Sequence, residues 1–119
     1  MKVKILLIDD DKELSEEMID LLAAEGYKVE AAFNGLDGEK LIKRNQYDVI
    51  LLDFKMPVLN GADLLKRIKK LTLKSKIILI SGRPFLEKEI KKQGLLPMVS
   101  AFICKPYDVK RLINTIKII

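Results

Sequence analysis

The sequence has no histidine and no tryptophan, and it contains a single cysteine among its 119 residues. Without histidine the chain cannot form a Ser-His-Asp triad, supply an imidazole ligand to a metal or carry a phosphohistidine. One cysteine excludes an internal disulfide and a cysteine-rich zinc site. These counts remove several catalytic and metal-binding classes at the outset.

Long apolar runs are also missing. The longest are short, strand-like pieces such as Val49–Leu52, far below the roughly 20 residues that a membrane-spanning helix needs. The first ten residues lack the form of a signal peptide, because their apolar run is short and ends in Asp9 and Asp10 instead of small cleavage-site residues. We therefore expect a cytoplasmic protein with no membrane partner.

Positive charge is in modest excess, with 22 Lys and Arg against 17 Asp and Glu and a net charge of +5. The basic residues are scattered, and no aromatic side chains interleave with them as a base-stacking platform requires. A solvated lysine-rich surface explains the charge better, so we do not expect direct nucleic-acid binding. The length fits one domain with one hydrophobic core, which we assign to residues 1–119.

Strand-like and helical patterns alternate along the whole chain. Apolar or half-polar runs predict strands at residues 3–8, 27–32, 49–52, 77–80 and 101–104. Helical periodicity follows each of them, as in Leu14, Met18, Leu21 and Leu22, and a fourth helix is expected over about 85–93. The order is (βα)₅, and strands that are apolar on both faces are typical of a parallel sheet covered on both sides. The sequence therefore predicts a doubly wound α/β domain.

Polar or charged residues follow four of the five predicted strands. Asp9 and Asp10 follow the first strand, Asp53 the third, Ser81 the fourth and Lys105 the fifth. Ligand sites of doubly wound sheets lie beyond the carboxyl ends of the strands, so we expect these side chains to converge on one rim.

Three carboxylates in one pocket would repel one another, and a hard cation such as Mg²⁺ removes that conflict. Asp9, Asp10 and Asp53 can supply the oxygen ligands, while Lys105 adds a fixed positive charge and Ser81 a donor. A metal, a cation and a donor around one carboxylate are suited to a phosphoryl group. We interpret Asp53 as a nucleophile that forms an acyl phosphate.

Simpler explanations exist for each residue taken alone. An Asp after a strand often caps the next helix, which is our interpretation of Asp11 and an open alternative for Asp9 and Asp10. Ser81 could start a turn, and Lys105 could be a surface lysine. The functional interpretation depends on all four strand ends together.

In its motifs the chain resembles the receiver domain of two-component response regulators, similar to the chemotaxis regulators, over essentially its whole length. Any one motif is weak, but four in the right order and spacing are specific. They are Ile8-Asp9-Asp10, Leu52-Asp53-Phe54-Lys55-Met56-Pro57 with Asn60-Gly61, Ile80-Ser81-Gly82, and Lys105-Pro106-Tyr107. The resemblance implies a flavodoxin-like sheet with strand order 2-1-3-4-5.

The resemblance also implies a role for each matching residue. Asp53 would be the phosphoacceptor, and Ser81 and Lys105 would contact the phosphoryl group. The implied Mg²⁺ ligands are Asp9, Asp10, Asp53 and the backbone carbonyl of Lys55. The resemblance further implies a cis peptide at Lys105-Pro106 and offers Phe102 as an aromatic switch, although an ordinary strand aromatic explains Phe102 equally well.

Similar proteins take the phosphoryl group from a phosphohistidine on a sensor kinase or phosphotransfer protein, which fits the absence of histidine here. The added charge on Asp53 would draw in Ser81 and reshape the face made by the fourth helix, fifth strand and fifth helix. An output domain or partner would read that face. We expect a switch, not a turnover enzyme, that is a monomer or a phosphorylation-dependent dimer, with its output in a partner or beyond residue 119.

One segment and one pair of residues depart from the family pattern. The segment between Ser81 and Lys105 contains Leu95–Met98 and is longer than usual, so helix four and its exit could be distorted. Lys55 and Arg83, two residues past Asp53 and Ser81, are both basic where the family tunes hydrolysis. We hypothesise that they shield the acyl phosphate or occupy the path of the attacking water, and that they thereby slow its hydrolysis.

Two rival functions stay open at this point. A small haloacid-dehalogenase-like phosphatase would use Asp9 and Asp11 as an Asp-x-Asp motif, but Glu13 stands where Thr or Val is expected and Asp53 would have no role. A basic nucleic-acid-binding domain with a vestigial site is the other rival.

The lone Cys104 is expected to be a small buried apolar residue.

Overall fold

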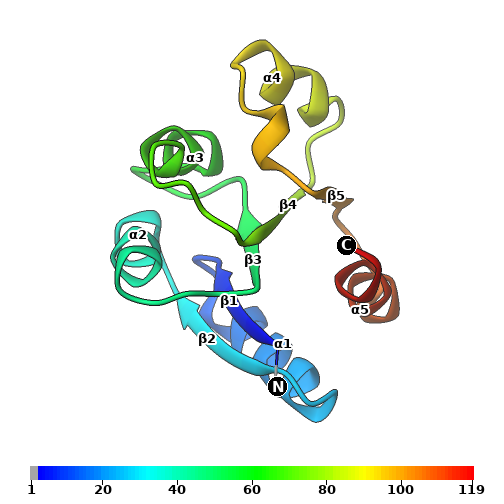
Figure 1. The fold of residues 1–119 in the computed structure, drawn as a ribbon. Helices are drawn as coiled ribbons and strands as arrows, with labels where there is room; N and C mark the ends of the chain where they lie inside the picture. Colours follow the sequence, from blue (N-terminus) through cyan, green and yellow to red (C-terminus); the bar gives the residue numbers. More distant parts are fainter. Residues whose placement is uncertain (1–2) are drawn as a thin grey trace.

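The computed structural model describes residues 3–119, so the first two residues of the segment tested as a signal peptide lie outside it. Within this range five strands alternate with five α-helices (Figure 1), which confirms the (βα)₅ order. The elements are β1 (Lys4–Ile8), α1 (Lys12–Ala24), β2 (Lys28–Ala32), α2 (Gly35–Arg44), β3 (Val49–Asp53), α3 (Gly61–Ile68), β4 (Lys76–Ser81), α4 (Leu86–Lys92), the 3₁₀ turn η1 (Leu96–Met98), β5 (Ala101–Cys104) and α5 (Val109–Ile118). None of the helices in residues 3–119 has the length and apolar character to cross a membrane.

The sheet has the strand order β2-β1-β3-β4-β5, as the resemblance implies. Every neighbouring pair is parallel, with Ile8 opposite Leu52 between β1 and β3 and Asp53 opposite Ile80 between β3 and β4. Parallel pairing in this register places the carboxyl ends of all five strands along one edge. The residues that follow the strands are therefore neighbours although they are far apart in sequence.

Helices cover both faces of the sheet (Figure 1), and a hydrophobic core lies on each face. Leu6 and Ile8 of β1 face the core under α2, α3 and α4, whereas Ile5 and Leu7 face the core under α1 and α5. Every residue of β3 is buried. This two-sided burial explains why the central strands are continuous apolar runs instead of alternating patterns.

Asp and Asn side chains begin four of the helices. Asp11, Asn34, Asn60 and Asp108 each accept a hydrogen bond from a backbone N–H in the first turn of α1, α2, α3 and α5. These bonds satisfy donors that a helix start otherwise leaves without partners. The interpretation of Asp11 as a helix cap is confirmed, which leaves Asp9 and Asp10 as the acidic residues available beyond β1.

The segment after β4 departs from the regular pattern, as its length suggests. The helix expected over 85–93 is shorter, because Phe85 has a left-handed backbone with φ 61° and provides no side-chain cap. The residues beyond α4 include the 3₁₀ turn η1 around Pro97. Leu86 and Ile90 of α4 still bury their side chains in the core, so the departure lies in the helix ends.

Cys104 corrects a minor expectation. Its side chain is exposed, not buried. Cys104 is the last residue of β5, and β5 is an edge strand of the sheet. An edge strand has a neighbour on one side only, so its final residue is not enclosed by the core in the way that the ends of β1 and β3 are.

Val58 is a strained position that allows a test of the loop geometry. Its φ is 67° and its side chain is 95% exposed, so a β-branched residue adopts a left-handed backbone without compensating contacts. We expect Val58→Gly to stabilise the fold by about 1 kcal/mol, measured by urea denaturation. Val58→Ala, which keeps a Cβ in the same backbone region, is the control. A Val58→Gly variant no more stable than Val58→Ala would show that the loop carries no such strain.

Candidate functional site

The three predicted metal-binding carboxylates meet at the carboxyl edge of the sheet. Ligand oxygens of Asp9, Asp10 and Asp53 all lie within 4.8 Å of one another. The pairing of β1 with β3 produces this arrangement, because Asp9 follows the last residue of β1 and Asp53 ends β3. Asp9 and Asp53 are each only 5% exposed, whereas Asp10 is open to solvent. The site is thus buried on one side and accessible on the other.

Lys105 reaches the same site from beyond β5. Its Nζ lies 3.3 Å from Oδ1 of Asp53, which forms an ion pair across the position of β4. The Lys105-Pro106 peptide is cis, as the resemblance implies. Lys105 is therefore more than a surface lysine, since its ammonium group contacts a buried carboxylate.

Burial and like charge act together on Asp53. Desolvation and, to a smaller extent, the charge of the neighbouring Asp9 raise the pKa of the Asp53 carboxyl, Lys105 opposes both effects, and the net result is a pKa of about 6. A cluster of oxygen donors with this excess of negative charge suits a hard divalent cation. Mg²⁺ fits the donor set, with Asp9, Asp10 and Asp53 as the carboxylates present to hold it.

Ser81 lies on the same rim at the end of β4. It is buried, and its Oγ accepts a hydrogen bond of 2.9 Å from the backbone N–H of Arg83. The hydroxyl thus starts a turn, as the simpler interpretation proposed. The same bond leaves the hydroxyl proton of Ser81 available as a donor, so the two interpretations are compatible.

Two residues of this region have surroundings that were not foreseen from the sequence, and Arg83 is the first. The guanidinium of Arg83 lies 5.4 Å from the centroid of the Phe54 ring and 3.1 Å from Oε2 of Glu89, which links the loop after β4 both to α4 and to the residue after Asp53. Tyr107 is the second, because burial and then the charges of Asp9 and Asp53 raise the pKa of its hydroxyl. Its position directly after Lys105-Pro106 was the available signal.

Asp11, the second carboxylate of the rival Asp-x-Asp motif, caps helix α1. Oδ1 of Asp11 accepts the backbone N–H of Leu14 at 3.0 Å, and Oδ1 of Asp9 accepts the N–H of Asp11 at 3.0 Å. The acidic cluster contains Asp10 and Asp53 beside Asp9 and leaves out Asp11. This geometry does not favour the phosphatase alternative.

Comparison with known proteins agrees with this fold and site. The family described as "Response regulator receiver domain" matches residues 5–117. Transcriptional regulatory protein DltR of Streptococcus agalactiae is 32% identical over 116 residues, which are 98% of this chain and 51% of that protein. Sporulation initiation phosphotransferase F of Bacillus subtilis is 29% identical over 119 residues, which cover 98% of this chain and 93% of that protein. The solved receiver domain of the Francisella response regulator 1452 has a TM-score of 0.87 at 32% identity and covers 98% of this chain and 95% of that chain.

The chain therefore belongs to the receiver-domain family of response regulators. Receiver domains are phosphorylation switches that bind Mg²⁺ in an acidic pocket, and response regulators work with sensor kinases and output domains. The chain spans about half the length of the transcriptional regulators among its relatives.

The raised pKa of Asp53 predicts a stability cost in the metal-free protein. The folded state holds this proton more tightly than the unfolded chain, so ionisation destabilises the fold progressively from about pH 4 to pH 6 and fully above. We expect Asp53→Asn to raise the free energy of unfolding by about 1–3 kcal/mol at pH 7 in EDTA, with less gain near pH 4.

Mg²⁺ should reduce that gain, because the cation stabilises the folded parent protein. Urea denaturation of both proteins with EDTA and with Mg²⁺ measures the difference. Asp20→Asn, at an exposed position of α1, controls for the loss of one negative charge. An Asp53→Asn variant that gains nothing over Asp20→Asn in EDTA would contradict the analysis of the site.

Proposed function

We propose that residues 1–119 form one receiver domain that accepts a phosphoryl group on Asp53 from the phosphohistidine of a sensor kinase or phosphotransfer protein. The observation that supports this assignment is the cluster of Asp9, Asp10 and Asp53 within 4.8 Å, with Lys105 Nζ 3.3 Å from Asp53. The absence of histidine from the chain fits a donor on another protein. The assignment makes the domain a switch without turnover of a substrate.

Asp53 is the best placed of the three carboxylates to act as the nucleophile. Oδ1 of Asp9 is engaged by a backbone N–H, and Asp10 is exposed, whereas Asp53 is buried against a lysine. In the proposed step an Asp53 oxygen attacks the phosphorus, the P–N bond to the donor imidazole breaks, and its electron pair stays on that ring. The product is an acyl phosphate on this chain and a dephosphorylated histidine on the partner.

The remaining side chains would stabilise the transferred group. Lys105 would shift from the Asp53 carboxylate to a phosphoryl oxygen, and the Ser81 hydroxyl would donate to another. Asp9, Asp10, Asp53 and the carbonyl of Lys55 would hold Mg²⁺, which would supply positive charge to offset the negative charge of the phosphoryl group. These roles fall to groups that lie on the same rim of the sheet as Asp53.

A groove beside the site offers a docking surface for the donor. It has a volume of about 440 Å³, is lined mostly by apolar side chains of α1 and of the segment after β5, and includes Lys105 itself. Leu21 within it is 46% exposed. A partner that packs on Leu14 and Leu21 would bring its phosphohistidine next to the Lys105–Asp53 pair.

The output would follow from movement of Ser81. A phosphoryl oxygen that accepts the Ser81 hydroxyl would draw the residue toward Asp53 and alter its turn with Arg83. Phe102, half-buried against the core under α4 and opposite Leu79 in the register, is the aromatic side chain that we propose responds. The face of α4, β5 and α5 would then change for an output domain or partner.

Labelling distinguishes this function from the phosphatase alternative. We expect acetyl phosphate with Mg²⁺ to phosphorylate the chain once, at Asp53, as mapped by borohydride trapping and mass spectrometry. Asp53→Asn and chelation of Mg²⁺ should both abolish the modification, while Asp11→Asn, in the rival motif, should retain it. Modification at Asp9 would instead support the phosphatase and refute the receiver assignment.

Lys55 and Arg83 are expected to prolong the lifetime of the acyl phosphate. Because both are basic and flank the site, we expect a Lys55→Ala, Arg83→Ala double variant to lose its phosphoryl group roughly tenfold faster. Glu89→Gln is the matched control, since it removes the ion-pair partner of Arg83 and keeps the guanidinium. Hydrolysis in the double variant that is no faster than in the parent would refute the shielding hypothesis.

A further inference from the structure

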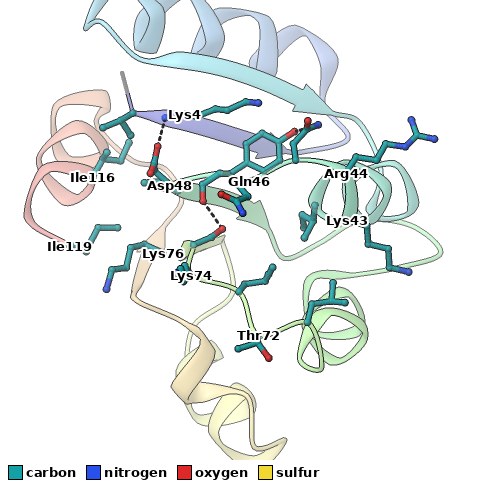
Figure 2. Close-up of a pocket in the computed structure, with 18 residues that line it drawn as sticks. Lys4, Lys43, Arg44, Gln46, Asp48, Thr72, Lys74, Lys76, Ile116 and Ile119 are labelled. Atoms are coloured by element: carbon teal, nitrogen blue, oxygen red, sulfur yellow. Dashed lines mark hydrogen bonds between the residues drawn. The ribbon is translucent and has the colours of Figure 1, made fainter. Parts of the chain in front are cut away.

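A second concave surface lies at the edge of the sheet opposite the acidic cluster. This basic groove has a volume of about 1050 Å³ and is formed by residues 3–4, 42–49 and 71–76 together with Ile116 and Ile119. Figure 2 shows these segments around it, from the start of β1, the end of α2, the loop before β4 and the end of α5. Val49 and Asp53 are the two ends of β3, so about 13 Å of strand separates the groove from the acidic site.

Hydrogen bonds between its segments hold the groove in shape. Oδ2 of Asp48 accepts the backbone N–H of Lys4 at 2.8 Å, and the Ser75 hydroxyl donates to the carbonyl of Tyr47 at 2.6 Å (Figure 2). The N–H of Lys76 donates to the carbonyl of Asp48 at 2.9 Å. These bonds join three chain segments, so the surface is largely preformed. The free-energy cost of ordering it when a ligand binds is therefore small.

The groove combines an apolar floor with a cationic rim. The floor consists of the buried Tyr47 and of aliphatic side chains, which include Ile42, Val49, Leu71, Leu73 and Ile116. The charged side chains that line it are Lys4, Lys43, Arg44, Lys74, Lys76 and, as the one acid, Asp48. Figure 2 shows Lys43 and Arg44 on one side and Lys74 and Lys76 on the other.

The positive charge of the rim is only partly balanced. Lys4 lies 3.8 Å from Glu30 and Lys43 lies 3.7 Å from Glu39. Within residues 3–119, Arg44, Lys74 and Lys76 form no ion pair. Cations that line a concave surface reinforce one another, so the groove attracts negative charge.

We propose that the basic groove binds an acidic segment of a partner protein that also carries apolar side chains. Asp or Glu residues of the segment would pair with Arg44, Lys74 and Lys76, while its apolar side chains would cover the aliphatic floor. A nucleic acid fits less well, because the single aromatic ring, Tyr47, is 5% exposed and has Lys4 Nζ 5.0 Å from its centroid. It therefore provides no platform on which a base could stack.

This surface gives the domain a binding site that its phosphorylation does not obstruct. The acidic cluster and the groove occupy opposite ends of the same strands. A partner tethered at the groove could remain bound while a phosphoryl donor occupies the other edge. The inference does not rest on the proposed phosphorylation, and binding can be tested with the unphosphorylated protein.

A fluorescein-labelled peptide that repeats Glu and Leu is the probe, with fluorescence anisotropy as the measurement. We expect saturable binding that weakens as salt is added, and a loss of affinity of about tenfold or more in Lys74→Glu, Lys76→Glu. Lys110→Glu, Arg111→Glu, with the same charge change at exposed positions of α5, should stay within about twofold of the parent. Thermal melts verify that both double variants fold. If Lys74→Glu, Lys76→Glu does not fold, Arg44→Glu takes its place.

Three results would overturn the proposal. They are equal losses in both double variants, a Glu-Ser repeat that binds as tightly as the Glu-Leu repeat, and an oligo-dT strand that competes as well as the peptide. Amide shifts in NMR spectra give an independent readout. They should fall on residues 42–49 and 71–76, and shifts confined to the α4, β5 and α5 face would also refute the assignment.

Discussion

The properties of the acidic site depend on the burial of one carboxylate at the end of an otherwise apolar strand. Asp53 ends β3, whose five residues are all buried, and it lies among two other carboxylates and one lysine. Such a group is costly to ionise, as its pKa of about 6 shows. The same cost makes the site responsive, because a cation or a phosphoryl group changes a charge balance that the metal-free protein leaves unfavourable.

The parallel sheet separates two kinds of surface. Its carboxyl edge concentrates acidic groups from the ends of β1 and β3, whereas its amino edge concentrates lysines and an arginine around an apolar floor. Helix caps contribute to this division, since the side chains of Asp11 and Asn60 accept N–H groups of α1 and α3 and Asp11 is not a member of the acidic cluster. The chain as a whole carries a net charge of +5, but the carboxyl edge of the sheet is locally negative because Asp9, Asp10 and Asp53 cluster there.

Much of the fold and of the candidate site could be predicted from the sequence. Val49–Leu52 reads as a buried strand because both of its faces are apolar, and Asp53 is conspicuous because no helix follows that it could cap directly. Other features could not be predicted. Cys104 is exposed because its strand is at the edge of the sheet, and the left-handed backbone at Phe85 shortens α4. The exposure of Cys104 depends on the order of the strands, which pairs segments that are distant in sequence.

Local pattern and composition determined by themselves the order of strands and helices, the helix caps and the polar residues at the strand ends, because these depend on side chains a few positions apart. Only the tertiary structure decided that Arg83 contacts Phe54 and Glu89 and that residues 3–4, 42–49 and 71–76 enclose a basic groove. Scattered lysines carry no sequence signal of a shared surface. They become one surface here because the parallel sheet aligns the starts of β1, β3 and β4 along a single edge.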